Sequence, residues 1–369
     1  MHIQGKKRIV VAMSGGVDSS TVAALLHQQG HEVIGITLRL WTPSPWNNGD
    51  RYGSCCSPQD VSDAKKVCQQ LGIPHYTFDM EQQFKTKVVD NFISEYLEGK
   101  TPNPCVRCNS FIKFDPLLKY AVALNAEYLA TGHYAQIRKT DLADHSSTDQ
   151  LCKAVDFTKD QSYFLYMLNQ KQLAQLLFPL GEYTKVQVRA FAEEFQLVNA
   201  KKQDSQDVCF LEGRNYREFI TERVQPEQIT KGPIQNTEGK VLGEHQGLAF
   251  YTIGQREKLG IAAGYPLYVV AKDTKTNTLV VGAENENLNS TCELESANWC
   301  AGSPPSESIH ASVKIRYRHA GSDATLLFTS DTEAKIQFDQ PQSSITPGQS
   351  AVFYNGDIVL GGGIIRKNS

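Results

Sequence analysis

A segment near the N-terminus has the residue types and spacing of an anion-binding loop. The string SGGVDSS, residues 14–20, directly follows a short apolar run and opens a stretch with helical spacing. Gly15 and Gly16 allow a tight turn that directs successive backbone N–H groups at an anion, and the serines add hydroxyl donors. The start of the helix adds partial positive charge. The segment predicts a phosphate site rather than a Gly-rich helix cap.

The loop differs from two better-known phosphate motifs. It has neither the lysine that ends a P-loop nor the spacing of the Rossmann glycine fingerprint. Without a loop lysine, backbone and hydroxyl groups must hold the phosphate while a metal ion neutralises the remaining charge. Asp18 is the natural ligand for that metal, and Mg²⁺ is the usual ion on nucleotide phosphates.

Three cysteines in two further segments have the types needed for sulfur chemistry. Cys105 and Cys108 lie in the proline-framed string TPNPCVRCN, residues 101–109, before an expected helix. Cys108 is close to that helix N-terminus and next to Arg107, and both features favour the nucleophilic thiolate. Cys209 follows a polar run far along the chain. These thiols can cooperate only if the fold brings the two segments together.

The other six of the nine cysteines are of two kinds. Cys68, Cys152, Cys292 and Cys300 lie among apolar residues and are interpreted as buried structural residues. The adjacent Cys55 and Cys56 leave a metal or redox role open. Nine cysteines in 369 residues are too sparse for a disulfide scaffold.

The elements that must position these residues alternate between strand and helix in the first half. The expected strands span 8–13, 33–38, 76–78 and 128–131. The expected helices span 19–29, 60–71, 84–97, 171–177 and 185–195, and residues 141–150 are expected to form a loop. This order predicts an α/β fold with a parallel sheet covered by helices on both faces.

The pattern changes after about residue 212. The expected strands are now short and β-branched, at 268–271, 278–281, 313–318 and 358–360. We expect a catalytic domain over 1–212, a small linking domain over 213–285, and an antiparallel barrel or sandwich over 286–369.

Composition limits the class of protein. A length of 369 residues favours two or three domains, and 40% hydrophobic with 21% charged residues is typical of a globular chain. No apolar run approaches the ~18 residues of a membrane span, and residues 1–6 lead into a strand without a signal-peptide core. A cytoplasmic protein is expected. The net charge of −3 argues weakly against a nucleic-acid partner but does not describe local patches.

Seven short strings occur in an order that carries a family resemblance. They are residues 14–20, 101–114, 131–134 (TGHY), 159–164 (KDQSYF), 204–210 (DSQDVCF), 252–256 (TIGQR) and 316–318 (RYR). The first resembles the loop of the ATP pyrophosphatase superfamily, which cleaves ATP to AMP and pyrophosphate. Together they resemble the bacterial tRNA-specific 2-thiouridylases over essentially the whole chain. This implies a PP-loop ATP pyrophosphatase domain (adenine nucleotide α-hydrolase-like), a small linking domain and a C-terminal β-barrel.

The resemblance also implies roles for single residues. The residues expected at ATP are Ala12, Met13, Ser14, Gly15, Gly16, Val17, Asp18, Ser19, Leu38 and Gly132. Cys209 is expected to carry a persulfide and Cys108 to be the second catalytic cysteine, which implies a disulfide between them during turnover. Asn103, Pro104 and Cys105 are expected at the target base. The residues expected to touch tRNA are His133, Lys159, Asp160, Gln161, Arg316, Tyr317 and Gln349.

Cys105 departs from the family pattern, in which many members have an aspartate there. An ordinary thiol, with a pKa of about 8.5, replaces a carboxylate only partly as an acid or base, since the carboxylate value is about 3.9. Cys105, Cys108 and Cys209 are alternatively the ligands of a [4Fe–4S] cluster with one open iron, or of zinc. The persulfide route is favoured over the cluster.

The implied reaction is 2-thiouridine synthesis at the wobble uridine, U34. ATP would adenylate the C2 oxygen, sulfur would replace it, and AMP and pyrophosphate would leave. The implied partners are tRNA (the Lys, Glu and Gln isoacceptors) and a sulfur carrier or cysteine desulfurase that donates the persulfide. Basic residues expected along the tRNA are Lys185, Arg189, Lys201, Lys202, Arg214, Arg217, Lys314, Arg316 and Arg318.

Two alternative functions are compatible with the phosphate loop but not with every feature of the sequence. An amidating or ligating PP-loop synthetase has the same fold but does not need two distant cysteines. A non-catalytic nucleotide- or RNA-binding module does not need the serines and Asp18 of the loop.

Overall fold

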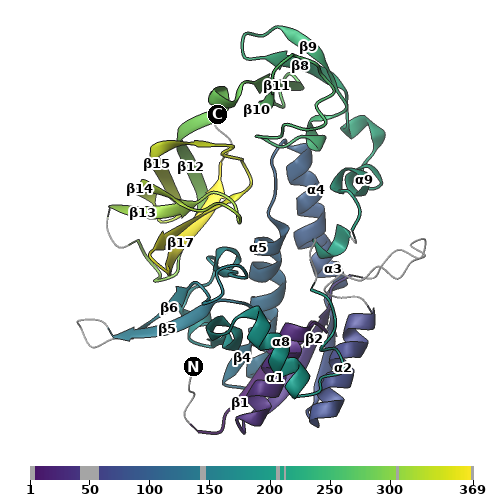
Figure 1. Ribbon diagram of the computed structural model, residues 1–369, viewed down its shortest axis with the longest axis vertical. Coiled ribbons are helices and arrows are strands. Elements are labelled where there is room, and N and C mark those ends of the chain that lie inside the picture. The colour runs from purple at the N-terminus through teal and green to yellow at the C-terminus, as the bar shows by residue number, and fades with distance from the viewer. Residues whose placement is uncertain are drawn as a thin grey trace.

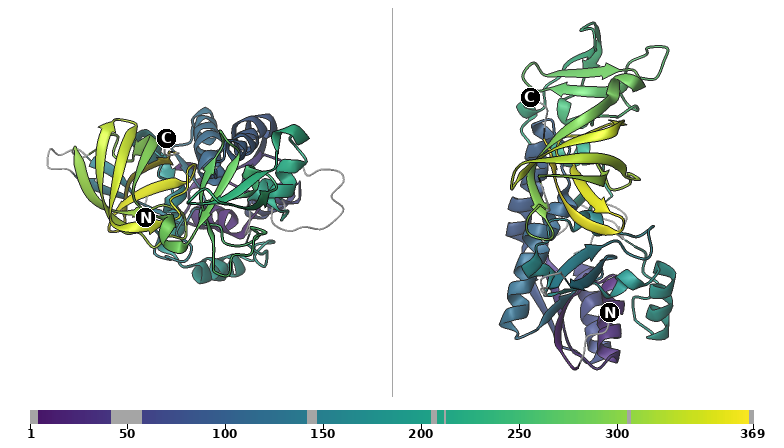
Figure 2. Two further views of the ribbon diagram at one scale, coloured as in Figure 1. Left: turned by 90° about the horizontal axis from the view of Figure 1, so that it is seen from above. Right: turned by 90° about the vertical axis from the view of Figure 1, so that its left-hand side faces the viewer.

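The structure is a computed structural model that describes residues 5–41, 58–141, 147–204, 208–211, 213–304 and 307–366. The N-terminal domain lies at the bottom of Figure 1, the middle domain at the top, and a barrel lies beside both (Figure 1). The right-hand view of Figure 2 shows the same elongated arrangement from the side, and the left-hand view looks along its long axis. Cys55 and Cys56 lie outside the described residues, as do Ser205, Gln206 and Asp207.

The N-terminal domain is built on a parallel five-stranded sheet with the order β3-β2-β1-β4-β7. Its strands are β1 (Arg8–Ala12), β2 (Glu32–Arg39), β3 (His75–Asp79), β4 (Tyr128–Ala130) and β7 (Leu176–Leu177). Alternate residues of β1 enter different cores, since Ile9 and Val11 pack on one face and Val10 on the other. The continuous apolar run seen in the sequence therefore reflects burial of both faces.

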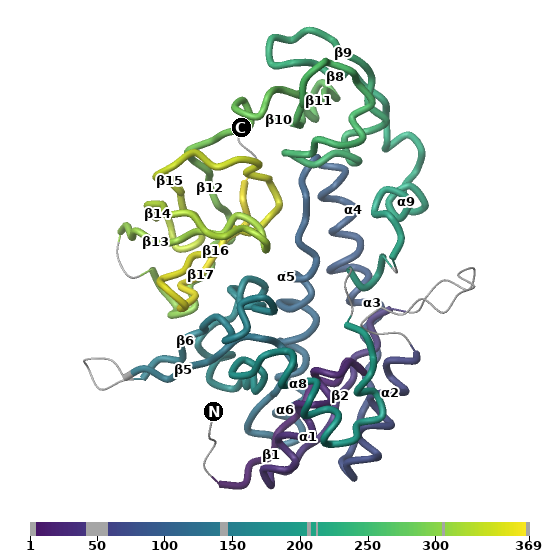
Figure 3. Tube along the Cα trace, in the orientation of Figure 1, coloured from purple at the N-terminus to yellow at the C-terminus, as the bar shows by residue number. Residues whose placement is uncertain are grey.

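Helices cover the two faces of this sheet. The described helices of the domain are α1 (Val17–Gln28), α2 (Pro58–Leu71), α3 (Glu81–Phe84), α4 (Asp90–Leu97), α5 (Pro104–Cys108), α6 (Asp115–Ala123), α7 (Gln170–Leu173) and α8 (Lys185–Glu194). One-turn π-helical segments, η1 (Lys85–Val89) and η2 (Asn109–Phe114), join α3 to α4 and α5 to α6. The tube in Figure 3 follows α4 upward from the sheet to the middle domain.

The middle domain begins with α9 (Tyr216–Thr221) and contains a sheet of order β10-β11-β8-β9. These strands are β8 (Gly232–Asn236), β9 (Val241–His245), β10 (Tyr268–Asp273) and β11 (Thr278–Gly282). Their core is small and includes Ile234, Val269 and Leu279. The rings of Tyr96 in α4 and Tyr216 in α9 stack with centroids 4.9 Å apart, which connects this domain to the first.

The C-terminal domain is an antiparallel barrel. Its strands are β12 (Leu288–Trp299), β13 (Ser308–Lys314), β14 (Ser322–Ser330), β15 (Glu333–Ser343), β16 (Ser350–Asn355) and β17 (Ile358–Ile365). They follow the order β12-β15-β14-β13-β16-β17, and pairing of β12 with β17 closes the circle. Closure removes the exposed strand edges of an open sheet. The expected order of a parallel-sheet domain, a small linking domain and a C-terminal barrel is confirmed.

Three local predictions were wrong. Residues 171–177 form only one helical turn, because Leu176 and Leu177 pair with β4 as a parallel edge strand. Residues 316–318 are not in a strand, since β13 ends at Lys314 and the chain must reverse before β14. Of the described residues in the expected loop at 141–150, Asp141 ends strand β5 (Gln136–Asp141) and residues 147–150 belong to strand β6 (Ser147–Cys152), in which Cys152 pairs with Ile358 of the barrel. Tertiary pairing outweighed helical spacing in the first case and local polarity in the third.

Candidate functional site

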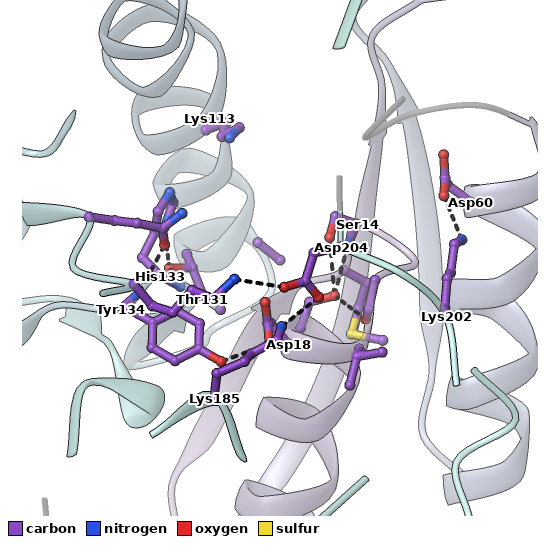
Figure 4. Close-up of a pocket in the computed structure, with 18 of the residues that line it drawn as sticks. Ser14, Asp18, Asp60, Lys113, Thr131, His133, Tyr134, Lys185, Lys202 and Asp204 are labelled. Carbon is purple, nitrogen blue, oxygen red and sulfur yellow. Dashed lines mark hydrogen bonds and ion pairs between the residues drawn. The ribbon is translucent and has the colours of Figure 1, made fainter. Parts of the chain in front are cut away.

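Many charged and polar side chains surround a cavity of about 420 Å³ at the carboxyl ends of β1 and β4. Such crevices are where ligands bind in open α/β sheets. The phosphate loop lies between the end of β1 at Ala12 and the start of α1 at Val17. Figure 4 shows charged side chains around this cavity that come from the start of α1, from α2, η2 and α8, and from the segment before Cys209.

Gly15 is the residue on which the shape of the loop depends most. It has a φ of +72°, and a Cβ there would lie 2.2 Å from the carbonyl oxygen of Asp60. Only glycine satisfies both conditions. The backbone N–H of Ser14 donates to Oγ of Ser19 over 3.1 Å, and that hydroxyl donates to the carbonyl oxygen of Gly16 over 3.2 Å. The loop is therefore closed by its own serine.

The loop is also held from behind by a distant segment. Nδ2 of Asn199 donates to the carbonyl oxygen of Gly15 over 3.0 Å and to Oγ of Ser20 over 2.9 Å. Nζ of Lys202 donates to the same Gly15 oxygen over 3.2 Å and forms ion pairs with Asp60 and Asp63. Residues 202–204 of this segment also line the cavity.

Asp18 points into the cavity and has two partners there. Its Oδ1 accepts hydrogen bonds from Nζ of Lys185 over 2.7 Å and from the hydroxyl of Tyr134 over 2.9 Å. Burial, together with the charge of Asp18, raises the pKa of Tyr134, so this hydroxyl remains a donor. A carboxylate beside hydroxyl groups at a phosphate loop provides the hard oxygen ligands that Mg²⁺ prefers. The residues present therefore fit the expected metal.

His133 lies at the inner end of the cavity. Its ring packs between Phe114 and Phe178, and its Nδ1 lies 2.7 Å from Oγ1 of Thr131. Burial, with a contribution from the charge of Lys113, lowers the pKa of His133 to about 3. The imidazole is therefore neutral at physiological pH and contributes a hydrogen bond rather than a charge.

Cys105 and Cys108 lie on a short helix, α5. Asn103 caps α5 by accepting a hydrogen bond from the backbone N–H of Val106 over 3.3 Å, and Pro104 occupies its first turn. Cys105 is exposed on this helix and Cys108 is buried. The guanidinium of Arg107 lies over the ring of Phe111 at 5.0 Å, and its Nε donates to the carbonyl oxygen of Lys87 in η1. This contact attaches α5 to the helix formed by α3, η1 and α4.

Cys209 lies next to a residue that packs on the same helix. It is half-buried and begins a short 3₁₀ turn, η5 (Cys209–Leu211). The ring of Phe210 is fully buried, with its centroid 5.9 Å from Phe84 of α3 and 5.1 Å from Phe92 of α4. The segments of Cys108 and Cys209 therefore share one supporting helix and one hydrophobic core.

Other thiols are remote from this chemistry. Burial raises the pKa of Cys152 to about 11 and those of Cys68, Cys292 and Cys300 to about 12, so they remain inert thiols, as expected of structural residues. Among the described residues, no group of three or more His, Cys, Asp or Glu side chains is arranged to hold a metal ion. Cys105, Cys108 and Cys209 do not form such a group, so the cluster alternative gains no support.

Comparison with known proteins covers all three domains. The family model of the tRNA methyl transferase HUP domain matches residues 7–213. Those of the tRNA methyl transferase PRC-barrel domain and the aminomethyltransferase β-barrel domain match 217–283 and 289–365. A tRNA-specific 2-thiouridylase of Carboxydothermus hydrogenoformans is 45% identical over 100% of both chains. One of Magnetococcus marinus is 48% identical over 97% of this chain and 99% of its own.

The chain belongs to the tRNA-specific 2-thiouridylase family. This membership confirms the family resemblance and the predicted enzyme class, a sulfurtransferase. A 4-thiouridine synthetase in an RNA complex with bound ATP has a TM-score of 0.33 and 15% identity over 60% of this chain and 51% of that chain.

The structure of this family member gathers nearly all residues predicted to bind ATP around one cavity. The residues that line it are Ala12, Met13, Ser14, Gly16, Val17, Asp18, Ser19, Leu38 and Gly132. Gly15 shapes the loop behind them. A Cβ on Gly132 would lie 2.9 Å from the backbone nitrogen of Ser19, so glycine is required where β4 ends against the loop.

The residues predicted to touch tRNA fall in three places. His133, Lys159, Gln161 and Tyr317 line the same cavity, and Tyr317 reaches it from the barrel. Arg316 and Gln349 line a second cavity, of about 690 Å³, where the three domains meet. Asp160 is buried and accepts hydrogen bonds from the backbone nitrogens of Ala154 and Ser162, so its described contacts hold its own loop.

Sequence reasoning missed several residues of the first cavity. Lys185 and Lys202 were expected on an outer tRNA-facing surface, yet both line the cavity beside the phosphate loop. Lys113, Tyr134, Asn199 and Asp204 were assigned no separate role. The loop has no lysine of its own, and lysines from other elements supply positive charge beside it. The polar segment that precedes Cys209 was the available signal for Lys202 and Asp204.

No helix within the described parts of the chain has the length and apolarity to cross a membrane.

Proposed function

We propose that this protein converts the wobble uridine of tRNA, U34, to 2-thiouridine, using ATP and a cysteine-bound sulfur. ATP binds in the first cavity and transfers AMP to the C2 oxygen, with release of pyrophosphate. A sulfur atom carried by Cys209 then replaces that oxygen, and AMP leaves with it. The substrates expected from the family are the Lys, Glu and Gln isoacceptors, with a sulfur carrier or cysteine desulfurase as the donor.

The observation that carries this proposal is that one segment both contacts the phosphate loop and leads to Cys209. The phosphate loop is bound from behind by Asn199 and Lys202, and the same segment leads directly to Cys209. A site for ATP activation and a reactive sulfur are thus connected over a few residues. A nucleotide-binding module or an amide-forming synthetase would not need the second feature.

The nucleotide site supplies binding and charge stabilisation. Loop hydroxyls and N–H groups from residues 14–20 hold the phosphates, and Leu38 and Gly132 border the remainder of the nucleotide. Mg²⁺, bound through Asp18, would neutralise the charge of departing pyrophosphate. Lys113, Lys159 and Lys185 line the cavity and add positive charge near the phosphates. No loop lysine is needed with this arrangement.

The sulfur step uses two cysteines in turn. The terminal sulfur of a Cys209 persulfide attacks C2 of the adenylated base, forming a carbon–sulfur bond as AMP leaves. The Cys108 thiolate then attacks Sγ of Cys209, breaking the sulfur–sulfur bond and leaving 2-thiouridine and a Cys108–Cys209 disulfide. A dithiol reductant restores both thiols. Asn103, Pro104 and Cys105 lie at the start of α5, where they would border the target base.

The same proposal divides the chain into functional regions. Residues 1–212 would carry the chemistry, 213–285 would form the small central domain, and 286–369 would form the barrel that contacts tRNA. Arg316, Tyr317 and Gln349 would meet tRNA from the barrel, and His133, Lys159, Asp160 and Gln161 would meet it from the first domain. The matched ranges of the family models support these boundaries.

The test is thiolation of unmodified tRNA with ³⁵S-labelled persulfide donor, with AMP measured in the same reaction. We expect labelled 2-thiouridine and AMP in equal amounts, both dependent on tRNA. A tRNA with cytidine at position 34 is the matched control and should give neither product. Labelled sulfur in tRNA without AMP formation, or AMP formation without any sulfur transfer, would contradict the proposal.

A further inference from the structure

Cys105 has no chemical step in the proposed sulfur route, although it lies on the same helix as Cys108. The two cysteines are three positions apart, and the backbone N–H of Asn109 donates to the carbonyl oxygen of Cys105. The turn from Cys105 to Asn109 is therefore α-helical. Residues three apart in an α-helix have Cα atoms about 5 Å apart, which is inside the range of about 4.4–6.8 Å that a disulfide requires. The backbone thus already places the two residues at bonding distance.

The helix holds this pair in a fixed geometry. Segment α5 continues without a break through η2 into α6, and Figure 3 shows α5 at the upper end of this helix and α6 at its lower end. Arg107, between the two cysteines, donates from Nε to the carbonyl oxygen of Lys87 over 2.7 Å. No movement of another segment is needed to bring Cys105 and Cys108 together.

The cysteines differ in their access to solvent. Cys105 is exposed, Cys108 is only 6% exposed, and Cys209 is half-buried. Cys108 belongs to the hydrophobic core against which Cys209 packs. A Cys108–Cys209 disulfide joins a buried residue to a half-buried one, whereas a Cys105–Cys108 disulfide includes an exposed residue. Since thiol–disulfide exchange depends on access to the attacked sulfur, a protein reductant would reach the second bond more readily.

We propose that Cys105 is the resolving cysteine of this enzyme, which attacks the Cys108–Cys209 disulfide and converts it to an exposed Cys105–Cys108 disulfide. The inference rests on the proposed function, which supplies the first disulfide. The partner that this end of α5 fits is a protein dithiol that reduces the second. Cys105 is in this scheme a catalytic residue of the step that follows release of 2-thiouridine.

The exchange balances without a further oxidant. The Cys105 thiolate attacks Sγ of Cys108 and the bond between Cys108 and Cys209 breaks. Cys209 leaves as a thiolate and accepts the proton that Cys105 lost, so the protein keeps one disulfide throughout. A protein dithiol then attacks Sγ of Cys105, is oxidised to its own disulfide, and returns both cysteines of α5 to thiols. Cys209 has by then already regained its thiol for the next sulfur.

The experiment maps disulfides after one turnover. The three cysteines fall in three different tryptic peptides, residues 101–107, 108–113 and 203–214. Protein loaded with sulfur receives unmodified tRNA and ATP without reductant, remaining thiols are alkylated with iodoacetamide, and linked peptides are identified by mass spectrometry. In the unmodified protein we expect 101–107 linked to 108–113, with Cys209 alkylated. In Cys105→Ser we expect 108–113 linked to 203–214.

A second readout compares two reductants during repeated turnover. With thioredoxin, Cys105→Ser and Cys105→Asp should form 2-thiouridine about tenfold more slowly than the unmodified protein, because neither a hydroxyl nor a carboxylate resolves a disulfide. Dithiothreitol is small enough to reach half-buried Cys209 and should restore most of this loss. Ser110→Ala is the matched control. It removes a hydroxyl that bonds Val106 within the same helix, keeps all three cysteines, and should show no loss with either reductant.

The outcomes separate this inference from the proposed function. Absence of 2-thiouridine from the unmodified protein would contradict the proposed function. If 2-thiouridine forms but 101–107 and 108–113 are never linked, only the resolving role is wrong. Equal losses for Cys105→Ser with both reductants would also overturn it, because Cys105 would then act at the target base rather than on the disulfide. Without tRNA, oxidised glutathione should link 101–107 to 108–113 in the resting protein, and failure to do so would overturn the inference independently of thiolation.

Discussion

The side-chain amide of Gln349 donates a hydrogen bond to the carbonyl oxygen of Thr101 over 3.0 Å, across 248 positions of sequence. The backbone N–H of Thr101 in turn donates to the carbonyl oxygen of Pro347 over 2.8 Å. A turn of the barrel is therefore bonded to the residue two positions before Asn103, the cap of the cysteine helix. The barrel therefore helps to position the helix of Cys105 and Cys108, in addition to carrying residues proposed to contact tRNA.

Gly348 is the residue to change in this contact. Its φ is +89°, and a Cβ would lie 2.9 Å from the carbonyl oxygen and 3.0 Å from the nitrogen of Thr101. Gly348→Ala should push the turn from the cysteine helix and lower the rate of thiolation about tenfold, because small displacements of reacting groups are costly. Binding of ATP should be unchanged, since Gly348 is outside the described lining of the nucleotide cavity.

The matched control for this variant is Gly356→Ala. Gly356 also has a positive φ, of +61°, but a Cβ there meets no atom within 4 Å. It reproduces the backbone strain without the collision. Equal loss of thiolation in both variants would show that backbone strain in the barrel causes the effect. It would contradict a role for the contact between this turn and Thr101.

The two cysteines proposed to transfer sulfur should be separable from nucleotide binding. Cys108→Ser and Cys209→Ser should each abolish 2-thiouridine formation, because an alkoxide does not replace a thiolate in sulfur transfer. Both should still bind ATP, since neither cysteine is in the described lining of the cavity. Thiolation and equilibrium ATP binding are measured on the same preparations. Near-full thiolation by either variant with a physiological donor would remove that residue from the mechanism.

Arg316 offers a test of the tRNA surface. It is exposed at the cavity where the three domains meet. Arg316→Ala should weaken tRNA binding and reduce the slope of log affinity against log salt by about 0.9 if it contacts one phosphate. Lys335→Ala removes a positive charge from the exposed side of β15 and should leave the slope unchanged. Identical slopes for Arg316→Ala and the unmodified protein would place this residue away from the phosphate backbone.

Most of the N-terminal fold could be predicted because its signals are local. The apolar run of β1, the glycines of the loop and the helical spacing of α1 lie next to one another in sequence, and each constrains the same turn. The phosphate loop residues consequently line one cavity, as expected. The barrel was predicted less sharply because its strands are defined by partners, and the turn at Arg316–Arg318 depends on where β14 begins.

The residues that the sequence did not identify are positioned by partners far away along the chain. Lys185 follows the helix cap Thr184 and resembles any exposed lysine, but α8 packs so that its ammonium meets Asp18, 167 positions away. Leu176 and Leu177 have helical neighbours, yet β4 supplies a free edge that pairs with them. No local pattern encodes either outcome. Cys209 was identified from a family motif, and the packing of its neighbour Phe210 on Phe84 and Phe92 was visible only in three dimensions.

Buried thiols give the protein a predictable sensitivity to alkaline pH. Burial raises the pKa of Cys292, in the barrel core, to about 12. In the unfolded chain a thiol ionises near pH 8.5, so above that value the unfolded state releases a proton that the folded state keeps. A raised folded pKa gives stability that is complete below the unfolded pKa and is lost as pH rises toward the folded pKa. Each buried thiol of this kind therefore weakens the fold as pH rises from about 8.5.

Cys292→Ala tests this linkage directly. At pH 7 the variant should be less stable by about 1–2 kcal/mol, because buried sulfur is lost and a small cavity remains. At pH 10 the deficit should shrink by about 2 kcal/mol. Ionisation of the Cys292 thiol favours the unfolded state at this pH, and the variant has no such thiol. Urea unfolding of the barrel at both pH values measures the two free energies. Val313→Ala, a non-ionising change in the same core, should keep the same deficit at both. A constant deficit for Cys292→Ala as well would mean that its thiol ionises in the folded barrel as readily as in the unfolded chain.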